Sequence, residues 1–220
     1  MRGGPNESAV RERAASYFEG VSPCHDFEHV RRVVATAKRL ADATEAGEHG
    51  PPRDVNRDVL VAAGWLHDVG RGREDRGEIA DHAAWGASEA RDVLRDLGVD
   101  DDAFLDAVAG CVRAHRFSND VAPETLEAEL LSDADNLDAT GAVGIARVFA
   151  YAGEHDDTLY DPDRPPSEDE SAAGETSFNH FHKKILELED RMYTDAGRAL
   201  AADRHAFVEE YLERFEREAN

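Results

Sequence analysis

The segment between Asp58 and Asp68 reads Val-Leu-Val-Ala-Ala-Gly-Trp-Leu and then ends in the polar pair His67–Asp68. It is apolar on every side, which predicts a central, fully buried element. A buried strand fits this composition as well, but Ala62, Ala63 and the length of the run favour a helix. A carboxylate at the end of a buried helix is costly unless it is paired or bound to a cation. We therefore expect a fold built around one central helix whose last turn carries polar chemistry.

Helical periodicity continues along the rest of the chain. Apolar residues recur at spacings of three and four, and we find no strand pattern, heptad array or internal repeat. The fold class is therefore predicted to be all-α. The expected helices are Ser8–Phe18, Asp26–Thr44, Asp58–Asp68, His82–Leu97, Asp101–His115, Pro123–Leu131, Leu137–Tyr151, Phe178–Leu188 and Asp195–Glu218.

Three polar segments are expected to separate these helices. Val69–Glu78 is rich in Gly, Arg and Asp, which predicts a loop, and Ser132–Asp135 is expected to be an acidic turn. Glu154–Glu175 is rich in Pro and acidic residues and has no apolar period. A loop of this length in a compact domain is typical of a lid or of a disordered segment.

The chain is strongly acidic, with 48 Asp and Glu against 25 Lys and Arg and a formal net charge of −23. Such a field repels phosphate backbones and disfavours duplex nucleic acid as a partner, although a local basic pocket could hold a small phosphate ester. The only lysines are Lys38, Lys183 and Lys184. An acidic, Lys-poor surface is typical of halophilic adaptation, because at 1 M salt charges are screened over about 3 Å. The alternative is an ordinary acidic cytosolic protein.

Two cysteines, Cys24 and Cys111, are too few for a disulfide framework, and free thiols suit a reducing compartment. No apolar run approaches the roughly 18–20 residues that span a bilayer. Met1–Val10 lacks the apolar stretch of a secretory signal. We expect a cytoplasmic protein without a membrane partner. Its oligomeric state, a dimer included, stays open.

Histidine and aspartate occur at positions where a solvated side chain is not expected. His29 shares an inward-facing stripe with Val30 and Val33, and His67 precedes Asp68 at the end of the buried helix. Imidazole and carboxylate together are ligands for divalent metals. A His–Asp pair alone is more often a helix end with a hydrogen-bonded Asp. The spaced set, which continues into the acidic cluster at 133–138, strengthens the metal interpretation.

Three segments resemble a known family. Residues 25–33 read His-Asp-Phe-Glu-His-Val-Arg-Arg-Val, residues 62–71 read Ala-Ala-Gly-Trp-Leu-His-Asp-Val-Gly-Arg, and residues 132–142 read Ser-Asp-Ala-Asp-Asn-Leu-Asp-Ala-Thr-Gly-Ala. They resemble the first-histidine helix, the His–Asp helix and the final-aspartate helix of the HD-domain superfamily of metal-dependent phosphohydrolases, in its small stand-alone branch. The similarity continues through residues 144–147 and 176–181.

The resemblance implies a helical bundle with a metal site in its core. It implies that His29, His67, Asp68 and Asp135 hold one divalent cation, for which Mn, Mg, Co, Ni, Fe and Zn are candidates. Ligands from separate helices leave coordination positions open for water and a phosphate oxygen. The expected reaction is attack of metal-activated water on phosphorus, and Asp68 could also orient that water.

His82 and His115 stand where members of the superfamily with two metals carry further histidines. They are expected to act in catalysis beside Asp68, either on a second metal or as contacts and proton donors to the substrate. The alternative is that each only hydrogen-bonds a helix end. Glu74, Asp75 and Glu78 are candidates for a general acid or base, and their spacing singles out none of them.

A phosphate ester also needs fixed positive charge. The residues expected to bind substrate are Arg71, Arg73, Arg147, Lys183 and Lys184. The two lysines carry weight because lysine is so rare in this chain, although a solvated helix face is an equal alternative for them. Arg147 could instead bind a buried carboxylate such as Asp138.

We expect a metal-dependent phosphohydrolase acting on a small phosphate ester, with a nucleotide as the leading class. A non-catalytic protein of the same fold that senses or binds a nucleotide is the first alternative. A structural metal site and an HD-type lyase or oxygenase are others. The expected organisation is a helical extension at 1–22, the HD metal-binding core at 23–153, the acidic loop or lid at 154–176, and C-terminal helices at 177–220 that complete the same domain.

Overall fold

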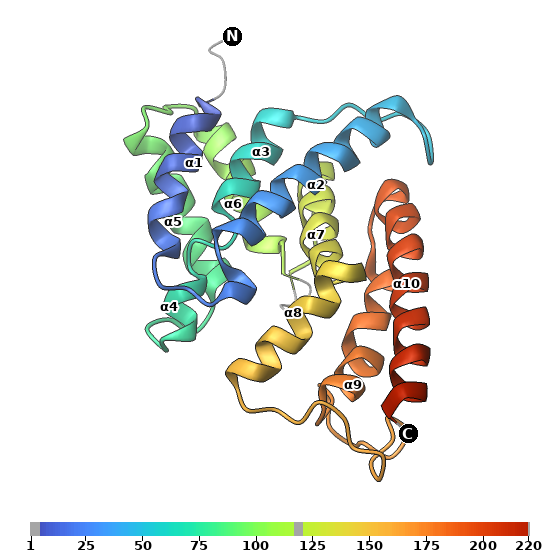
Figure 1. Ribbon diagram of the computed structural model, residues 1–220. Coiled ribbons are helices and arrows are strands. Elements are labelled where there is room, and N and C mark those ends of the chain that lie inside the picture. The colour runs from blue at the N-terminus through green and yellow to red at the C-terminus, as the bar shows by residue number, and fades with distance from the viewer. Residues whose placement is uncertain (1–4, 117–120, 220) are drawn as a thin grey trace.

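The computed structural model describes residues 5–116 and 121–219, which are predominantly helical (Figure 1). The α-helices are α1 (Glu7–Ala15), α2 (Phe27–Ala46), α3 (Arg57–Leu66), α4 (Arg71–Asp75), α5 (His82–Asp96), α6 (Asp102–Ala114), α7 (Leu126–Asp138), α8 (Gly141–Glu154), α9 (Ser177–His180) and α10 (Asp195–Ala219). Shorter turns are the 3₁₀ turns η1 (Ser16–Phe18), η2 (Pro23–His25) and η4 (Leu186–Arg191) and the π-helical turn η3 (Phe181–Ile185). In these two ranges the only β contact is an isolated bridge between Thr158 and Thr176. The predicted all-α class is confirmed.

Helix α3 lies at the centre of the bundle. It packs against α1, α2, α6 and α7, and seven of its ten residues are buried. Helices α2 and α3 approach so closely that a Cβ on Gly64 would lie 3.0 Å from Cγ2 of Val34. The prediction of a central buried helix is confirmed. The His67–Asp68 pair that follows this helix therefore lies inside the protein.

The other helices lie on two sides of this centre. Figure 1 shows α1, α4 and α5 on one side and α9 and α10 on the other. Helix α5 packs along α6, while α10 packs against α8, α7 and α2. The first and last helices of the chain therefore both pack onto this central group: α1 lies against α3, and α10 lies against α2 and α7.

Side-chain caps determine where two of the helices begin. Asp26 accepts a hydrogen bond from the backbone N–H of His29 at the start of α2. Asp81 accepts two backbone N–H groups at the start of α5. Each cap contributes about 1 kcal/mol to helix stability. Because His29 and His82 lie in the first turns of these helices, the caps also set where the two imidazoles enter the core.

The expected acidic turn at Ser132–Asp135 is wrong, because α7 runs unbroken through it. Asp133 is fully buried in this helix. Its carboxylate accepts hydrogen bonds from the backbone N–H groups of Tyr193 and Thr194 and from the Thr194 hydroxyl. These bonds offset much of the cost of burying a carboxylate, although burial still raises the pKa of Asp133. Partners far away in the sequence therefore stabilise a helix in a segment whose composition predicts a turn.

Two other expected segments differ in local structure. The loop predicted at Val69–Glu78 contains the short helix α4. The chain turns there because Gly70 lies against α5, where a Cβ would be 2.7 Å from the carbonyl oxygen of His82. The helix predicted at Phe178–Leu188 instead passes from α9 into the π-helical turn η3 and the 3₁₀ turn η4, which leaves Phe181 and Ile185 both buried.

The acidic loop at 155–176 is held by Asp169. The buried carboxylate of Asp169 accepts hydrogen bonds from Ser171, from the backbone N–H of Glu175 and from the amide of Asn179. The ammonium of Lys183 donates to the backbone oxygen of Asp169 at 2.6 Å. These bonds tie the loop to α9 and η3, although most of its side chains stay exposed.

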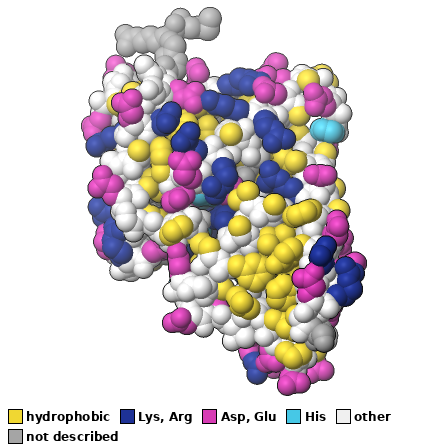
Figure 2. All heavy atoms as spheres, viewed as in Figure 1, with side chains coloured by type: hydrophobic (Ala, Val, Ile, Leu, Met, Phe, Trp, Pro, Cys, Tyr) yellow, Lys and Arg dark blue, Asp and Glu magenta, His cyan; other side chains and the backbone are white. Residues whose placement is uncertain are grey.

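None of the helices in the described ranges is both long and apolar enough to cross a bilayer. Acidic and basic side chains cover much of the face seen in Figure 2, and hydrophobic side chains gather over α8. Val143 and Tyr151 are the large exposed apolar residues of that helix.

Candidate metal centre

Five helices bring six His and Asp side chains to one place inside the bundle. His29 comes from the first turn of α2, His82 is the first residue of α5, and Asp135 lies near the end of α7. The others follow directly after helices: His67 and Asp68 after α3, and His115 after α6. The four imidazoles and Asp68 are each at most 5% exposed, whereas the Asp135 side chain is 24% exposed. The centre therefore lies deep in the protein and opens to solvent near Asp135.

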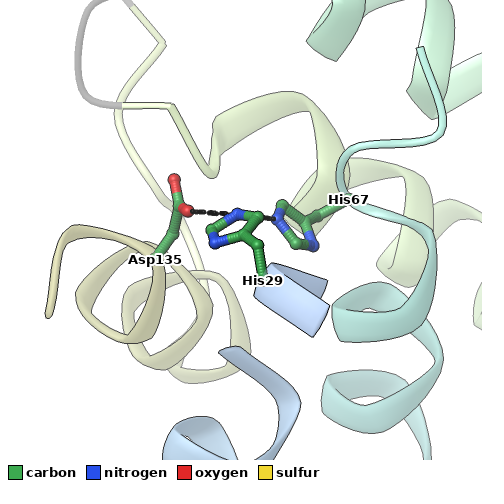
Figure 3. A group of neighbouring side chains, drawn as sticks. All are labelled: His29, His67 and Asp135. Carbon is green, nitrogen blue, oxygen red and sulfur yellow. Dashed lines mark hydrogen bonds and ion pairs between the residues drawn. The ribbon is translucent and has the colours of Figure 1, made fainter. Parts of the chain in front are cut away.

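One cluster consists of His29, His67 and Asp135, which point toward one another in Figure 3. Nε2 of His29 lies 3.3 Å from Oδ1 of Asp135 and 3.4 Å from Nε2 of His67. Nε2 of His67 lies 3.9 Å from the same Asp135 oxygen. Two nitrogens and one oxygen at such separations could hold a single metal ion.

A second cluster consists of Asp68, His82 and His115. Oδ1 of Asp68 lies 3.1 Å from Nε2 of His82 and 3.5 Å from Nε2 of His115. The two imidazole nitrogens are 3.4 Å apart. The structure thus gives His82 and His115 a carboxylate neighbour in common, and this cluster has the same donor types as the first.

Asp68 connects the two clusters. Its other oxygen, Oδ2, faces the first cluster at 3.6 Å from Nε2 of His29 and 3.7 Å from Nε2 of His67. Each oxygen of one carboxylate therefore serves a different pair of histidines. All four residues of the ligand set implied by the family resemblance, His29, His67, Asp68 and Asp135, lie together in this group.

The outer nitrogen of every imidazole is hydrogen-bonded away from the centre. Nδ1 of His67 donates to the backbone oxygen of Gly64 at 2.9 Å, and Nδ1 of His115 donates to the backbone oxygen of Val112 at 2.7 Å. A carbonyl oxygen only accepts, so Nδ1 carries the proton and, in the neutral ring, Nε2 keeps a lone pair. These two histidines consequently present a free nitrogen lone pair to the centre, which is the form that binds a metal.

Carboxylates occupy the corresponding positions behind the other two histidines. Nδ1 of His29 lies 2.7 Å from Oδ2 of Asp138, and Nδ1 of His82 lies 2.8 Å from Oε2 of Glu74. A carboxylate behind an imidazole orients the ring and makes its inner nitrogen a stronger metal ligand. The donor set therefore fits a divalent cation in orientation as well as in chemical type.

The charges of the centre favour a positive charge at its middle. Burial alone would lower the pKa of His29, but the carboxylates of Asp135, Asp138 and Asp68 raise it to about 10. Burial opposes ionisation of Asp68 and Asp135, yet the surrounding imidazoles hold the pKa of both carboxyl groups below the usual range. A cation bound here would meet ionised carboxylates.

A cavity of about 830 Å³ leads from this centre toward α8 and the acidic loop, and the residues of both clusters except His67 line it. Of the five expected substrate-binding residues, Arg71, Arg147 and Lys184 line the cavity. The other two point elsewhere. Arg73 stacks over the Trp85 ring, with 4.8 Å from its guanidinium to the ring centroid, and Lys183 holds the backbone of Asp169.

Sequence reasoning missed Arg116, which also lines the cavity and donates to Glu74 at 3.2 Å. Arg116 directly follows His115, so its place next to a candidate ligand was the available signal. Glu74 binds Arg71, Arg116 and His82 together. Asp138 binds Arg147 as well as His29. Each carboxylate behind an imidazole therefore also positions cationic side chains at the cavity.

Comparison with known proteins agrees with this geometry. The family model of the HD domain matches residues 26–140. The uncharacterized protein YpgQ of Bacillus subtilis is 29% identical over 212 residues, which cover 95% of this chain and 91% of YpgQ. An HD-superfamily hydrolase from Bacillus thuringiensis has a solved structure that is 32% identical, with a TM-score of 0.73 over 97% of this chain and 96% of that one. The crystal structure of YpgQ in complex with ADP is 27% identical, with a TM-score of 0.72 over 97% of each chain.

Proposed function

This chain belongs to the HD-domain family, and from that premise we propose that it is a metal-dependent phosphohydrolase whose substrate is a nucleotide. One observation carries the proposal. Four imidazoles direct their Nε2 atoms at two ionised carboxylates, and all members of this group except His67 line a cavity that also contains cationic side chains. A centre that only stabilised the bundle would be closed by protein ligands and would need no such cavity.

The proposed ligands of the first cation are His29, His67, Asp68 and Asp135. We also propose a second cation held by Asp68, His82 and His115, a role that the short distances among these three side chains support. When bound, a divalent cation neutralises phosphoryl charge and makes a coordinated water acidic near pH 7.

The chain's own cationic side chains complete the proposed phosphate site. Arg71 and Arg147 line the cavity with their guanidinium groups held by Glu74 and Asp138. Within the described part of the chain Lys184 has no ion-pair partner, although it lines the same cavity. Lys184 is therefore the cation most available to a phosphate oxygen, and the two arginines supply fixed positive charge beside the ligands.

A nucleotide is the substrate class that we favour. The structure of YpgQ with ADP supports it, because that relative matches this chain over almost its whole length. The cavity is also large enough for more than a phosphate group. The second candidate is a non-catalytic nucleotide-binding protein of the same fold, which the ADP complex of YpgQ favours equally.

We further propose that this enzyme works in a reducing, salt-rich cytoplasm. The net charge of −23 and the two free, buried cysteines support that setting. A requirement for molar salt in folding or activity is the expected result.

Metal analysis followed by phosphate release tests the proposed activity. The purified protein is stripped with a chelator and reloaded in turn with each candidate divalent cation. Release of phosphate or pyrophosphate is then measured across nucleoside mono-, di- and triphosphates. We expect turnover that depends on the cation and disappears in Asp68→Ala. Tight ADP binding without turnover of any nucleotide would instead establish the non-catalytic candidate.

A further inference from the structure

The cavity continues well beyond the metal centre. Apolar residues of α8, η3 and η4 also line it, namely Val148, Ala152, Ile185 and Leu188. The end of the acidic loop, residues 173–176, and the start of α9 line it as well. A volume of about 830 Å³ lies within the range of sites that bury a whole organic ligand.

Two uncharged, buried polar groups that line the cavity have no hydrogen-bond partner among the described residues. They are Nδ2 of Asn136 and Oγ of Ser177, and the two residues are only 3% and 4% exposed. A buried donor left unpaired costs about 1–3 kcal/mol. The neighbouring polar groups are satisfied: Oγ1 of Thr176 accepts from the backbone of Asn179, whose amide donates to Asp169.

The backbone around both groups is firmly placed. Asn136 lies within α7, directly after the candidate ligand Asp135. Ser177 is the first residue of α9, after the capping Thr176, and its backbone N–H donates to the carbonyl oxygen of Thr158 at 2.9 Å. Only the two side-chain groups are left without a hydrogen bond, and they come from two different helices that both line the cavity.

We propose, on the premise of the phosphohydrolase function above, that Asn136 and Ser177 bind the nucleoside part of a nucleotide whose phosphates lie at the metal centre. The amide of Asn136 and the hydroxyl of Ser177 donate hydrogen bonds to oxygen or nitrogen acceptors of the base or of the sugar. The apolar side chains of α8, η3 and η4 cover the rest of the nucleoside. Asn136 and Ser177 are thus specificity-determining residues, separate from the cations that hold phosphate.

Binding measurements with two probes test this assignment. ADP carries a nucleoside, whereas inorganic pyrophosphate carries only the phosphates. Both are titrated calorimetrically into wild-type protein, Asn136→Ala and Ser177→Ala at one fixed concentration of divalent cation. Loss of a neutral hydrogen bond is expected to weaken ADP binding about 3- to 10-fold in each variant. Pyrophosphate binding and metal content are expected to stay unchanged.

Ser132→Ala is the matched control. Ser132 is a buried serine of α7 whose Oγ has no partner among the described residues, and it is not part of the cavity wall. All three substitutions remove an unpaired polar group, but only the two cavity variants should weaken ADP binding. Without ligand, Ser177→Ala should melt at or above the wild-type temperature. The substitution removes a buried hydroxyl that gives up its hydrogen bonds to water on folding and gains none in the folded protein.

The outcomes show whether the acceptor lies on the base or on the sugar, and whether the assignment fails. Ribose 5-phosphate, which has no base, should lose affinity in the variants if the acceptor is on the sugar and should not if it is on the base. Equal ADP affinity in all variants, or a parallel loss for pyrophosphate, would overturn the assignment. Metal loss in Asn136→Ala would do so for that residue. If wild-type protein binds no ADP and hydrolyses no nucleotide, the proposed function itself fails.

Discussion

Oδ1 of Asp68 lies 3.1 Å from Nε2 of His82, while the opposite oxygen of the same carboxylate faces His29 at 3.6 Å. One side chain therefore belongs to two clusters, and its loss should affect both. Nε2 of His115 lies 3.5 Å from the same Oδ1 of Asp68 and 3.4 Å from Nε2 of His82. The two clusters can be separated by choosing which of these residues to replace.

The first prediction concerns metal stoichiometry. Asp68→Ala should lose both equivalents of bound cation and all turnover, because it removes a ligand from each cluster. His115→Ala should lose one equivalent and keep the other, held by His29, His67 and Asp135. Elemental analysis of the purified proteins measures the stoichiometry, and far-ultraviolet circular dichroism checks that the helices remain.

Two results would contradict that prediction. Turnover retained in Asp68→Ala would remove the carboxylate from the machinery. An unchanged metal content in His115→Ala, with slower turnover, would show that His82 and His115 contact the substrate rather than a second cation.

The sequence was sufficient for the parts of the site that depend on local rules and spacing. Asp26 caps α2 through a contact three residues away, so its effect is visible in the sequence. The apolar run ending at His67 had to be buried. The ordered set of His and Asp then identified the family, because unrelated helical proteins have no reason to repeat that order with its flanking residues.

Side-chain direction and distant contacts could not be predicted. Lys183 and Lys184 are neighbours, yet one holds the acidic loop and the other lines the cavity. Arg73 is drawn away by the Trp85 ring, which lies on another helix. Asp133 was assigned to a turn because its partners, around Thr194, come much later in the chain. Each depends on packing between helices, which residue spacing does not record.

The second prediction concerns Asp138, the carboxylate behind His29. Burial opposes its ionisation, but His29 and Arg32 hold the pKa of Asp138 below its usual range. Asp138→Asn keeps the shape and removes the charge that orients and strengthens His29. Metal affinity, measured by competition with a chromogenic chelator, should fall about 10- to 100-fold. Glu129→Gln on the same helix, which has only a 3.3 Å surface ion pair with Arg53, should leave it unchanged. Equal affinities in the two variants would remove Asp138 from the support of the centre.

The third prediction uses the neighbouring lysines. Lys184→Gln should raise KM for a nucleotide about 10- to 100-fold, because a cation at the phosphate site contributes about 1.5–3 kcal/mol through charge-assisted bonds. Lys183→Gln should instead lower the free energy of unfolding by about 1 kcal/mol, since its bond to Asp169 secures the acidic loop. Steady-state kinetics and urea unfolding of both variants give the comparison. The prediction fails if the kinetic effect belongs to Lys183 and not to Lys184.

The last prediction is a pH dependence of stability that comes from a buried thiol. Burial raises the pKa of the Cys111 thiol from 9.0 to about 12, so the folded protein keeps a proton that the unfolded chain releases above pH 9. The contribution of this thiol to stability is complete below pH 9 and is lost as the pH rises toward 12, by about 2 kcal/mol at pH 10.5.

Cys111→Ala lacks the thiol and should lose less stability than wild type between about pH 8 and pH 10.5. Urea unfolding of both proteins at both pH values gives a double difference in which other groups that titrate, such as Tyr17, cancel. Alanine leaves a small cavity among the buried side chains of α6, so the variant starts from a lower stability at pH 8. The test is therefore how much the free energy of unfolding falls between the two pH values in each protein. Equal decreases in the two proteins would mean that the Cys111 thiol ionises in the folded state as readily as in the unfolded chain.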